Sequence, residues 1–363
     1  MRRRLRIGVV GVGRIGRRHA RLVAASPSAE LVAIADPAPD ATKFSIALDV
    51  PAYRTPEEML AVERLDGMIL ATPNAHHRDG ALVGLGAGIA TLVEKPIATS
   101  VAEGLEMALA ADRTGVPLLV GHHRRHSPLI VAAREAVASG VLGDVVAVLG
   151  TALFPKPGDY FESAPWRASP GGGPILINLV HEIDSLRVLC GEIVSVQAVA
   201  SNRVRRHPVE DTVAVTMRFA SGALGAFLLS DAAASGLSWE QTSGEDPAYA
   251  QYPGQDTYVV TGTRGSLGIP TLRLSLVENA PSWHEPMQTR RLVASDADPL
   301  ARQLEHFCEV IRGCAQPLVP ALDAVQTLRV TQAVAEAAES GETVWCGPGE
   351  PAGTLLDRPP GGS

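Results

Sequence analysis

Residues 5–16 read LRIGVVGVGRIG, a short apolar run followed by three glycines in the pattern G-x-G-x-x-G. A buried strand that leads through such glycines into a helix is typical of a dinucleotide-binding turn. Gly11 permits the tight turn, Gly13 lets the backbone approach a pyrophosphate, and Gly16 lets the helix pack close to the strand. The helix then begins with Arg14 and Ile15, whose amides face the anion. A purely structural glycine turn is the alternative interpretation.

A single carboxylate, Asp36, closes the next apolar run and follows Gly16 by 20 residues. A carboxylate at this place accepts hydrogen bonds from the ribose hydroxyls of NAD and repels the 2′-phosphate of NADP. Pro37 and Ala38 come next and supply no cation to bind such a phosphate. The sequence therefore predicts NAD as the cofactor, with a helix-capping role as the alternative for Asp36.

The rest of the first 121 residues alternates short apolar runs with amphipathic segments, which is typical of a parallel sheet. The runs are rich in Val, Ile and Leu without strict alternation, as expected when helices cover both faces. The pattern predicts an α/β fold with a doubly wound parallel sheet, strands at 6–10, 31–35, 67–71, 91–93 and 118–120, and helices that include 15–25 and 101–113.

After Arg125 the pattern changes to period two with Gly-containing turns, which predicts an α+β domain with an open, mostly antiparallel sheet. Residues 212–229 predict a hairpin that turns at Ser221 and Gly222. We expect domains at 1–123 and 124–346, followed by a loose tail at 347–363. The apolar strands predict a homo-oligomer, a dimer or tetramer, through this sheet. Further strands are expected at 145–153, 193–200, 258–262 and 272–277, and helices at 178–189, 299–311 and 321–340.

Composition excludes several classes of protein. The chain has 363 residues and a net charge of −7, so we expect two domains and no nucleic-acid partner. No apolar run approaches the roughly 18 residues of a membrane helix. Residues 2–4 are arginines that lead directly into the first strand, which predicts a cytoplasmic protein without a cleaved leader. The four cysteines form no C-x-x-C pair, so neither a metal site nor a disulfide framework is expected.

Three further motifs follow in the chain: Thr72-Pro73-Asn74 with His77, Glu94-Lys95-Pro96, and Trp166-Arg167 before three glycines with His181 and Asp184. With the glycine pattern they resemble the Gfo/Idh/MocA family of NAD(P)-dependent sugar and polyol oxidoreductases, over residues 5–345. The resemblance implies a Rossmann domain, then a domain with an open sheet, and a nicotinamide end near Lys95. It also implies a cofactor cleft lined by the first two motifs, although Asn74 is as well explained as a turn residue.

Two residues are candidates for the proton chemistry. A cation beside a carbinol oxygen lowers the barrier to hydride transfer, which Lys95 can supply from a loop stiffened by Pro96, with a cis peptide bond expected. His181 can change its charge near neutral pH and is the candidate general base or acid. The alternatives are a surface lysine paired with Glu94 and a histidine packed in the core.

Two further side chains share the predicted helical face of His181. Asn178 lies one turn before it and Asp184 one turn after it, where Asp184 can orient the imidazole. We expect both to contact substrate. Many family members carry an aspartate four residues before this histidine, but Ile177 stands there. The proton must then be handled by His181 with Lys95, or by groups of the substrate.

A basic run, His122-His123-Arg124-Arg125-His126, follows the last predicted parallel strand. His123 and Arg124, together with Arg167, are predicted to hold an anionic group of the substrate, with structural pairing as the alternative. Trp166 offers an aromatic face on which a sugar ring stacks.

These residues together predict an NAD-dependent dehydrogenase or reductase that acts on a ring hydroxyl of a sugar, an inositol or a sugar acid. A second possibility is a glycoside hydrolase that oxidises the sugar transiently, eliminates the aglycone, adds water and returns the hydride. A third is a non-catalytic protein that senses NAD.

Overall fold

The computed structural model describes residues 3–347, which form two compact units. The first unit includes residues 3–132 and 293–328, and the second includes residues 133–292 and 329–347. The predicted boundary at residue 123 differs from this division. Residues 293–328 join the first unit because Leu304 and Phe307 pack in its core. The predicted loose tail lies outside the described residues, except for Gly347.

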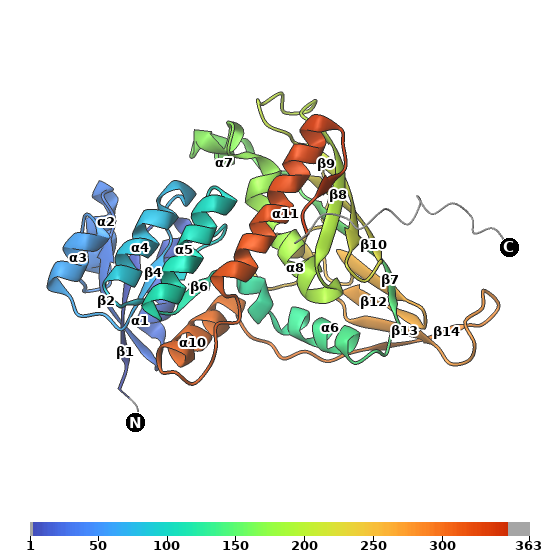
Figure 1. The fold of residues 1–363 in the computed structure, drawn as a ribbon, viewed down its shortest axis with the longest axis horizontal. Helices are drawn as coiled ribbons and strands as arrows, with labels where there is room; N and C mark the ends of the chain where they lie inside the picture. The colour runs from blue at the N-terminus through green and yellow to red at the C-terminus, as the bar shows by residue number, and fades with distance from the viewer. Residues whose placement is uncertain (1–2, 348–363) are drawn as a thin grey trace. The chain divides into compact units, whose positions relative to one another are not determined.

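The first unit contains a six-stranded parallel sheet with the order β3-β2-β1-β4-β5-β6 (Figure 1). This is the strand order of a dinucleotide-binding doubly wound sheet, in which the order reverses between β1 and β4. All five predicted strands form, and the short edge strand β3 was not predicted. The strands are β1 Leu5–Val10, β2 Ala29–Ala35, β3 Ala52–Tyr53, β4 Gly67–Leu70, β5 Ala90–Val93 and β6 Leu118–Val120.

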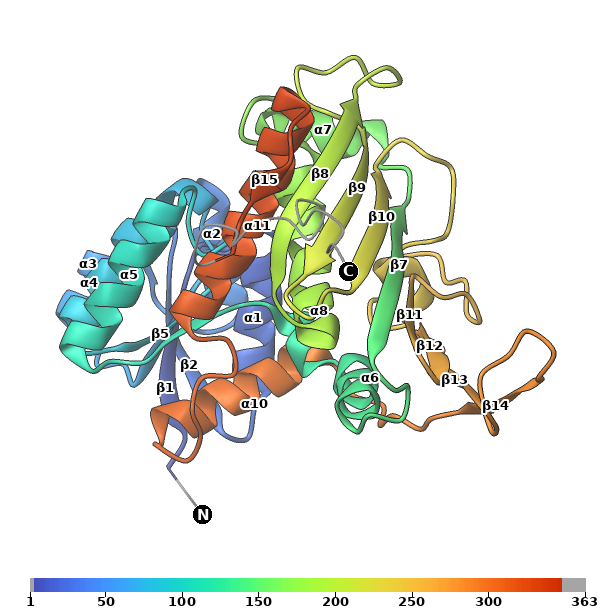
Figure 2. The same cartoon turned by 45° about the vertical axis from the view of Figure 1, so that its right-hand side comes forward.

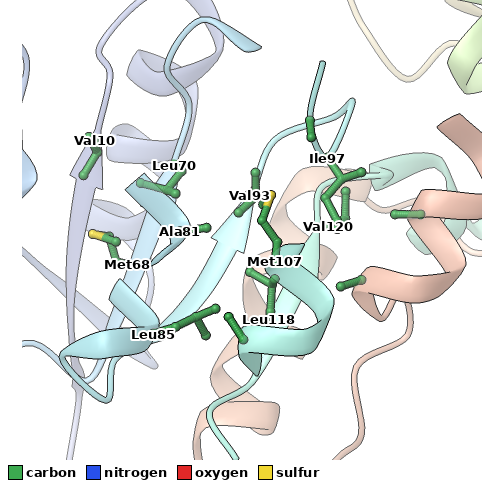
Figure 3. Close-up of a cluster of buried hydrophobic side chains, with 14 of the residues drawn as sticks. Val10, Met68, Leu70, Ala81, Leu85, Val93, Ile97, Met107, Leu118 and Val120 are labelled. Carbon is green, nitrogen blue, oxygen red and sulfur yellow. The ribbon is translucent and has the colours of Figure 1, made fainter. Parts of the chain in front are cut away.

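Helices cover both faces of this sheet. Strand side chains alternate between two apolar clusters, so that Leu70 and Val93 face one layer while Ile69 and Leu92 face the other. Figure 3 shows the first of these clusters. Its helices are α3 Pro56–Val62, α4 His77–Gly86, α5 Val101–Thr114 and the start of α11 Ala321–Ser340. The other cluster is covered by α1 Arg14–Ala25, α2 Pro39–Ala47 and α10 Pro299–Ile311.

The second unit is built on a nine-stranded sheet with the order β14-β13-β12-β11-β7-β10-β9-β8-β15 (Figure 2). Strand β10 pairs in parallel with β7, and the other neighbours pair antiparallel, so the predicted mostly antiparallel sheet is confirmed. The strands are β7 Val145–Leu153, β8 Ile193–Ser201, β9 Thr212–Phe219, β10 Leu224–Ser230, β11 Tyr258–Gly262, β12 Gly265–Ile269, β13 Arg273–Val277, β14 Met287–Arg291 and β15 Val344–Trp345.

One face of this sheet is buried and the other is open. Buried and exposed side chains alternate along β9, and along β10 up to Leu229. Helix α8 Val180–Cys190 contacts strand β7 of this sheet, and the Tyr258 hydroxyl of β11 donates a hydrogen bond to Glu182 of α8. The opposite face exposes Leu149 and Leu224 by 58% and 52%. The predicted homo-oligomer through this sheet stays a prediction.

The predicted helix at 178–189 begins differently from our expectation. Residues Ile175–Leu179 form one π-helical turn, and α8 follows at Val180. Glu210 accepts the Ile175 amide, and a Cβ on Gly173 would lie 2.6 Å from the Glu210 carboxylate, so this start is tightly packed. The remaining helical segments are η1 Asn74–His76, η2 His123–His126, α6 Pro128–Ala138, α7 Gly158–Glu162, η3 Pro165–Ala168 and α9 Trp239–Thr242.

No helix within residues 3–347 is both long enough and apolar enough to cross a membrane.

Candidate active site

The three glycines after β1 form a backbone cradle at the start of α1. Gly11 has a φ of +82°, which favours glycine, and a Cβ on Gly16 would lie 1.8 Å from the Gly11 carbonyl oxygen. A Cβ on Gly13 would meet no atom of the described chain within 4 Å. The first amides of α1 receive no side-chain cap, because Gly13 precedes them. This arrangement fits a pyrophosphate at the helix N-terminus.

The carboxylate of Asp36 is held by the backbone at the end of β2. Its Oδ2 accepts from the Val12 amide at 2.7 Å, and its Oδ1 accepts from the Ala38 amide at 2.8 Å. Each carboxylate oxygen retains a further lone pair. Asp36 is partly exposed and adjoins the cradle, so its geometry fits the ribose hydroxyls of NAD.

The loop after β4 is the third segment of the candidate cofactor site, and it lies at the point where the strand order reverses. The Ala71 amide donates to the Val10 carbonyl, which ties this loop to β1. The Thr72 hydroxyl oxygen is buried and has no hydrogen-bond partner among residues 3–347. A buried polar atom of this kind is satisfied when a ligand binds beside it. Pro73 is exposed and Asn74 is partly exposed, and their predicted cofactor contacts stay predictions.

Replacing Asp36 by alanine should change the preference between the two cofactors. We expect the Kd for NAD to rise by about 10- to 100-fold, the cost of hydrogen bonds to a charged group, and the Kd for NADP to rise less than about threefold. Calorimetric titration with both cofactors measures the ratio, which also cancels any shared loss from the Val12 and Ala38 contacts. Equal losses for NAD and NADP would contradict the ribose role.

Glu94 begins the Glu-Lys-Pro loop after β5, and its side chain is buried. It accepts a hydrogen bond from His19 of α1 at 2.7 Å, and its other oxygen accepts from the Lys95 amide at 3.2 Å. Burial alone would raise the pKa of Glu94. The hydrogen bond and charge of His19, with the charges of His123 and Lys95, instead lower that pKa to about 2. The predicted contact of Glu94 with the cofactor stays a prediction.

This carboxylate makes stability depend on pH. Because the pKa of Glu94 is lower in the folded protein than the usual 4.5, its contribution to stability is present above pH 4.5 and is lost as the pH falls toward 2. We expect Glu94→Gln to lower the free energy of unfolding by about 1–3 kcal/mol at pH 7. At pH 3.5 the difference from wild type should shrink by about a third to a half. Urea unfolding at both pH values tests this.

The matched control for this prediction is Glu57→Gln, since Glu57 is exposed on α3. We expect that substitution to leave the free energy of unfolding nearly unchanged at both pH values. A difference between Glu94→Gln and wild type that stays constant from pH 7 to pH 3.5 would show that the Glu94 carboxylate is not held ionised by its partners.

His77, also predicted to bind the cofactor, joins two loops of the site. Its ring is fully buried, with Nδ1 2.8 Å from the Pro96 carbonyl oxygen and Nε2 3.0 Å from the Thr72 carbonyl oxygen. Burial lowers the pKa of His77, although both carbonyls favour its protonated form. The side chain thus holds the Glu-Lys-Pro loop against the Thr72 loop. Its predicted contact with the cofactor stays a prediction.

Lys95 follows Glu94 directly and is partly buried. The Lys95–Pro96 peptide bond is cis, as expected. The backbone around Lys95 is anchored on one side by Glu94 and on the other by the contact between Pro96 and His77. The structure therefore places the predicted catalytic lysine on a fixed loop at the carboxyl edge of the parallel sheet.

The basic run after β6 carries less positive charge than its sequence indicates. Burial lowers the pKa of His123 to about 3 and that of His126 to about 3, so both rings are neutral near pH 7. Arg125 forms an ion pair with Asp323, and the His126 ring stacks on His306 with centroids 5.2 Å apart. These contacts favour the structural alternative for much of the run. Anion binding by His123 and Arg124 stays a prediction.

The second unit holds the candidate substrate residues around α8. His181 is partly buried and Asp184 is buried, and their predicted roles stay predictions. Asn178 lies in the π-helical turn and is partly exposed. Its Oδ1 accepts a hydrogen bond from the Lys156 amine at 2.5 Å. Sequence reasoning missed Lys156, and its one available signal was a lysine within an otherwise apolar segment after a strand.

Trp166 and Arg167 lie in η3, before the three glycines. Trp166 is 51% exposed, which leaves its ring available to a sugar. The Arg167 guanidinium lies 4.0 Å from the centroid of the Tyr160 ring, and its Nη1 donates to the Tyr160 carbonyl at 2.6 Å. A Cβ on Gly172 would lie 2.5 Å from the Trp166 carbonyl oxygen, so the glycines pack directly against this segment.

Two family models match the chain. The model described as "Oxidoreductase family, NAD-binding Rossmann fold" matches residues 5–122, and the model of the GFO/IDH/MocA C-terminal domain matches residues 130–268. The chain belongs to the Gfo/Idh/MocA oxidoreductase family. The predicted family and fold class are thereby confirmed, and NAD agrees with the nucleotide-binding model.

Individual members of the Gfo/Idh/MocA family are similar over parts of the chain. It is 33% identical to the rhizopine catabolism protein MocA of Rhizobium meliloti, over 52% of this chain and 58% of that protein. It is 32% identical to an inositol 2-dehydrogenase of Rhizobium meliloti strain 1021, over 60% of this chain and 66% of that protein. The chain thus spans less than two thirds of the length of these two relatives.

One solved structure is similar to this chain over nearly its whole length. The WlbA dehydrogenase from Bordetella pertussis, in complex with NADH and UDP-GlcNAcA, is 26% identical with a TM-score of 0.77. The match covers 94% of this chain and 99% of that one.

Proposed function

We propose that this protein is an NAD-dependent oxidoreductase that transfers hydride between NAD and a ring hydroxyl of a sugar, an inositol or an anionic sugar derivative. The observation that supports this most strongly is the anchored Glu94-Lys95 loop, which lies at the carboxyl edge of the sheet that carries the glycine cradle and Asp36. The named relatives, an inositol 2-dehydrogenase and a WlbA dehydrogenase among them, support the same class of reaction.

In this mechanism the chain's own residues bind the nucleotide and move the hydroxyl proton. The backbone at residues 11–16 binds the pyrophosphate and Asp36 binds the ribose. The bound nicotinamide supplies the hydride acceptor. The Lys95 ammonium stabilises negative charge on the substrate oxygen as the proton leaves, and His181 receives that proton as the general base. In the reverse direction His181 returns it.

Ile177 stands where many family members carry an aspartate, and this replacement limits which residues can accept the proton. Ile177 has no group that accepts a proton, and Asn178 beside it has an amide that cannot do so. Transfer of the substrate's hydroxyl proton therefore depends on His181 and Lys95. Because this second base is missing, a second function remains a candidate: a glycoside hydrolase that oxidises its sugar transiently and returns the hydride.

Incubation of the purified protein with NAD and a panel of sugars, inositols, sugar acids and aryl glycosides separates the candidates. The proposed oxidoreductase forms NADH in proportion to substrate consumed. A redox-neutral glycosidase releases the aglycone without net NADH. A protein that binds NAD but shows neither reaction across the panel would be a sensor, and the proposal would be wrong.

A further inference from the structure

The chain contains only three lysines, Lys43, Lys95 and Lys156, beside 29 arginines. Lys43 is exposed and Lys95 is the candidate catalytic residue. Lys156 has no role in the proposed mechanism, yet it is only 8% exposed. Its burial distinguishes it from Lys43, and its compact amine packs differently from a guanidinium, which is larger and planar.

Every contact of Lys156 holds its amine in one place. Its backbone amide donates to the Asp231 carbonyl at 2.8 Å, and its own carbonyl accepts from Arg205 at 2.8 Å. The amine lies 3.6 Å from the Asp231 carboxylate and 4.8 Å from the centroid of the Tyr160 ring. Arg205 also donates to that carboxylate at 2.6 Å. Asp231 is therefore shared between two cations and cannot neutralise both.

The short contact between Lys156 and Asn178 determines how the Asn178 amide is oriented. An ammonium can only donate hydrogen bonds, so the amide must turn its oxygen toward Lys156. Its NH2 group then points away from Lys156. Asn178 is partly exposed and lies one turn before His181. The NH2 group of Asn178 thus offers hydrogen-bond donors on the side of the amide that faces away from Lys156.

Arg167 supplies a second set of donors through the same aromatic ring. The Tyr160 ring that adjoins the Lys156 amine also lies 4.0 Å from the Arg167 guanidinium. Arg167 donates through Nη1 to the Tyr160 carbonyl and, at 3.4 Å, to the Ser163 hydroxyl. It pairs with no carboxylate in the described part of the chain. The ring and the carbonyl hold Arg167 without cancelling its charge.

We propose that Lys156 is a positioning residue for substrate recognition: it turns the Asn178 amide so that its NH2 group and the Arg167 guanidinium form a donor-only subsite for a carboxylate of the substrate. The inference rests on the proposed function and narrows its substrate class to sugar acids or polyol acids. A planar carboxylate matches one guanidinium and one amide NH2 group.

The first experiment measures the contact between Lys156 and Asn178 without using activity. Labelling the lysine amines with 15N gives three NMR signals, which K43R and K156R assign. Burial lowers the pKa of Lys156 to about 8, which its signal should report. We expect N178D to raise this pKa by at least one unit, because a carboxylate stabilises the ammonium. The Lys43 signal is the internal control. An unchanged pKa of Lys156 in N178D would overturn the inference.

The second experiment compares D-galacturonate with D-galactose, which differ by one carboxylate in place of a CH2OH group. With wild-type protein and NAD we expect a lower KM for the acid. In K156M that KM should rise by about 10- to 100-fold, while kcat and the reaction with galactose change less than about threefold. K156R retains a cation and should recover part of the loss. Equal losses on both sugars, or a preference for galactose or for galactose 6-phosphate, would overturn the inference.

A binding measurement distinguishes a failure of this inference from a failure of the proposed function. Absence of NADH with every sugar would refute the hydride-transfer proposal alone. In that case galacturonate should still shift the Lys156 signal of the wild type, and galactose should not. The shift should disappear in N178L, which keeps the size of the side chain but has no donor. No shift with galacturonate in the wild type would overturn the subsite.

Discussion

Lys95→Met lowers kcat/KM by about 10³-fold or more, because it removes the cation that stabilises the substrate oxygen as its proton leaves. The loss should appear mainly in kcat, since the charge on the oxygen develops in the transition state. Binding of NAD should weaken less than about tenfold, because the cradle and Asp36 provide most of the cofactor contacts. Initial rates of NADH formation and calorimetric titration with NAD measure the two effects separately.

The matched control is Lys43→Met, which removes an exposed lysine of α2 in the same unit. We expect it to retain wild-type kinetics. A Lys95→Met variant that keeps more than about a tenth of the wild-type kcat/KM would show that the lysine does not act at the reacting oxygen. The hydrogen bonds of Glu94 to His19 and to the Lys95 amide do not involve the replaced side chain, so the loop should keep its structure.

His181→Gln should lower kcat/KM for oxidation by about 10²- to 10³-fold and change its dependence on pH. As a general base, His181 acts in its neutral form, so protonation of its ring should give the pH profile of wild-type activity an acid limb. Glutamine has no group that titrates there, and this acid limb should be absent from the variant. Rates of NADH formation between pH 5 and 9 measure both effects.

His284→Gln provides the control, because His284 is exposed in the loop between β13 and β14. It should keep both the rate and the acid limb. A His181→Gln variant with a lower rate but an unchanged acid limb would assign the titration to another group. His181 would then orient the substrate and would not accept its proton.

Much of the first unit could be predicted from local patterns. Each parallel strand is a short apolar run, and the cradle glycines follow β1 within six residues. A Cβ at Gly11 or Gly16 would clash with backbone atoms, so only glycine fits at these positions. The glycines in the sequence therefore already indicate this turn. Lys95 could be located because it stands two residues after the carboxyl end of β5, within the Glu-Lys-Pro motif.

Contacts between distant residues could not be predicted. Helix α10 was predicted as an element, but its packing against the parallel sheet depends on Phe307 and Leu304 meeting strands some 300 residues earlier. His19 and Glu94 are 75 residues apart, and neither sequence neighbourhood indicates the pair. Burial lowers the pKa of His123 and of His126, and the local sequence of residues 122–126 did not indicate that burial.

Period and glycine placement in the chain predict the strands, the nucleotide cradle and the loop that carries Lys95, because each is marked by a pattern within a few residues. The orientation of the Asn178 amide is different: it depends on Lys156, 22 residues away, and on the aromatic and acidic side chains that hold that amine. A hydrogen bond between side chains on separate elements forms only when packing brings them together. Only the folded chain therefore reveals whether this part of the site donates or accepts hydrogen bonds.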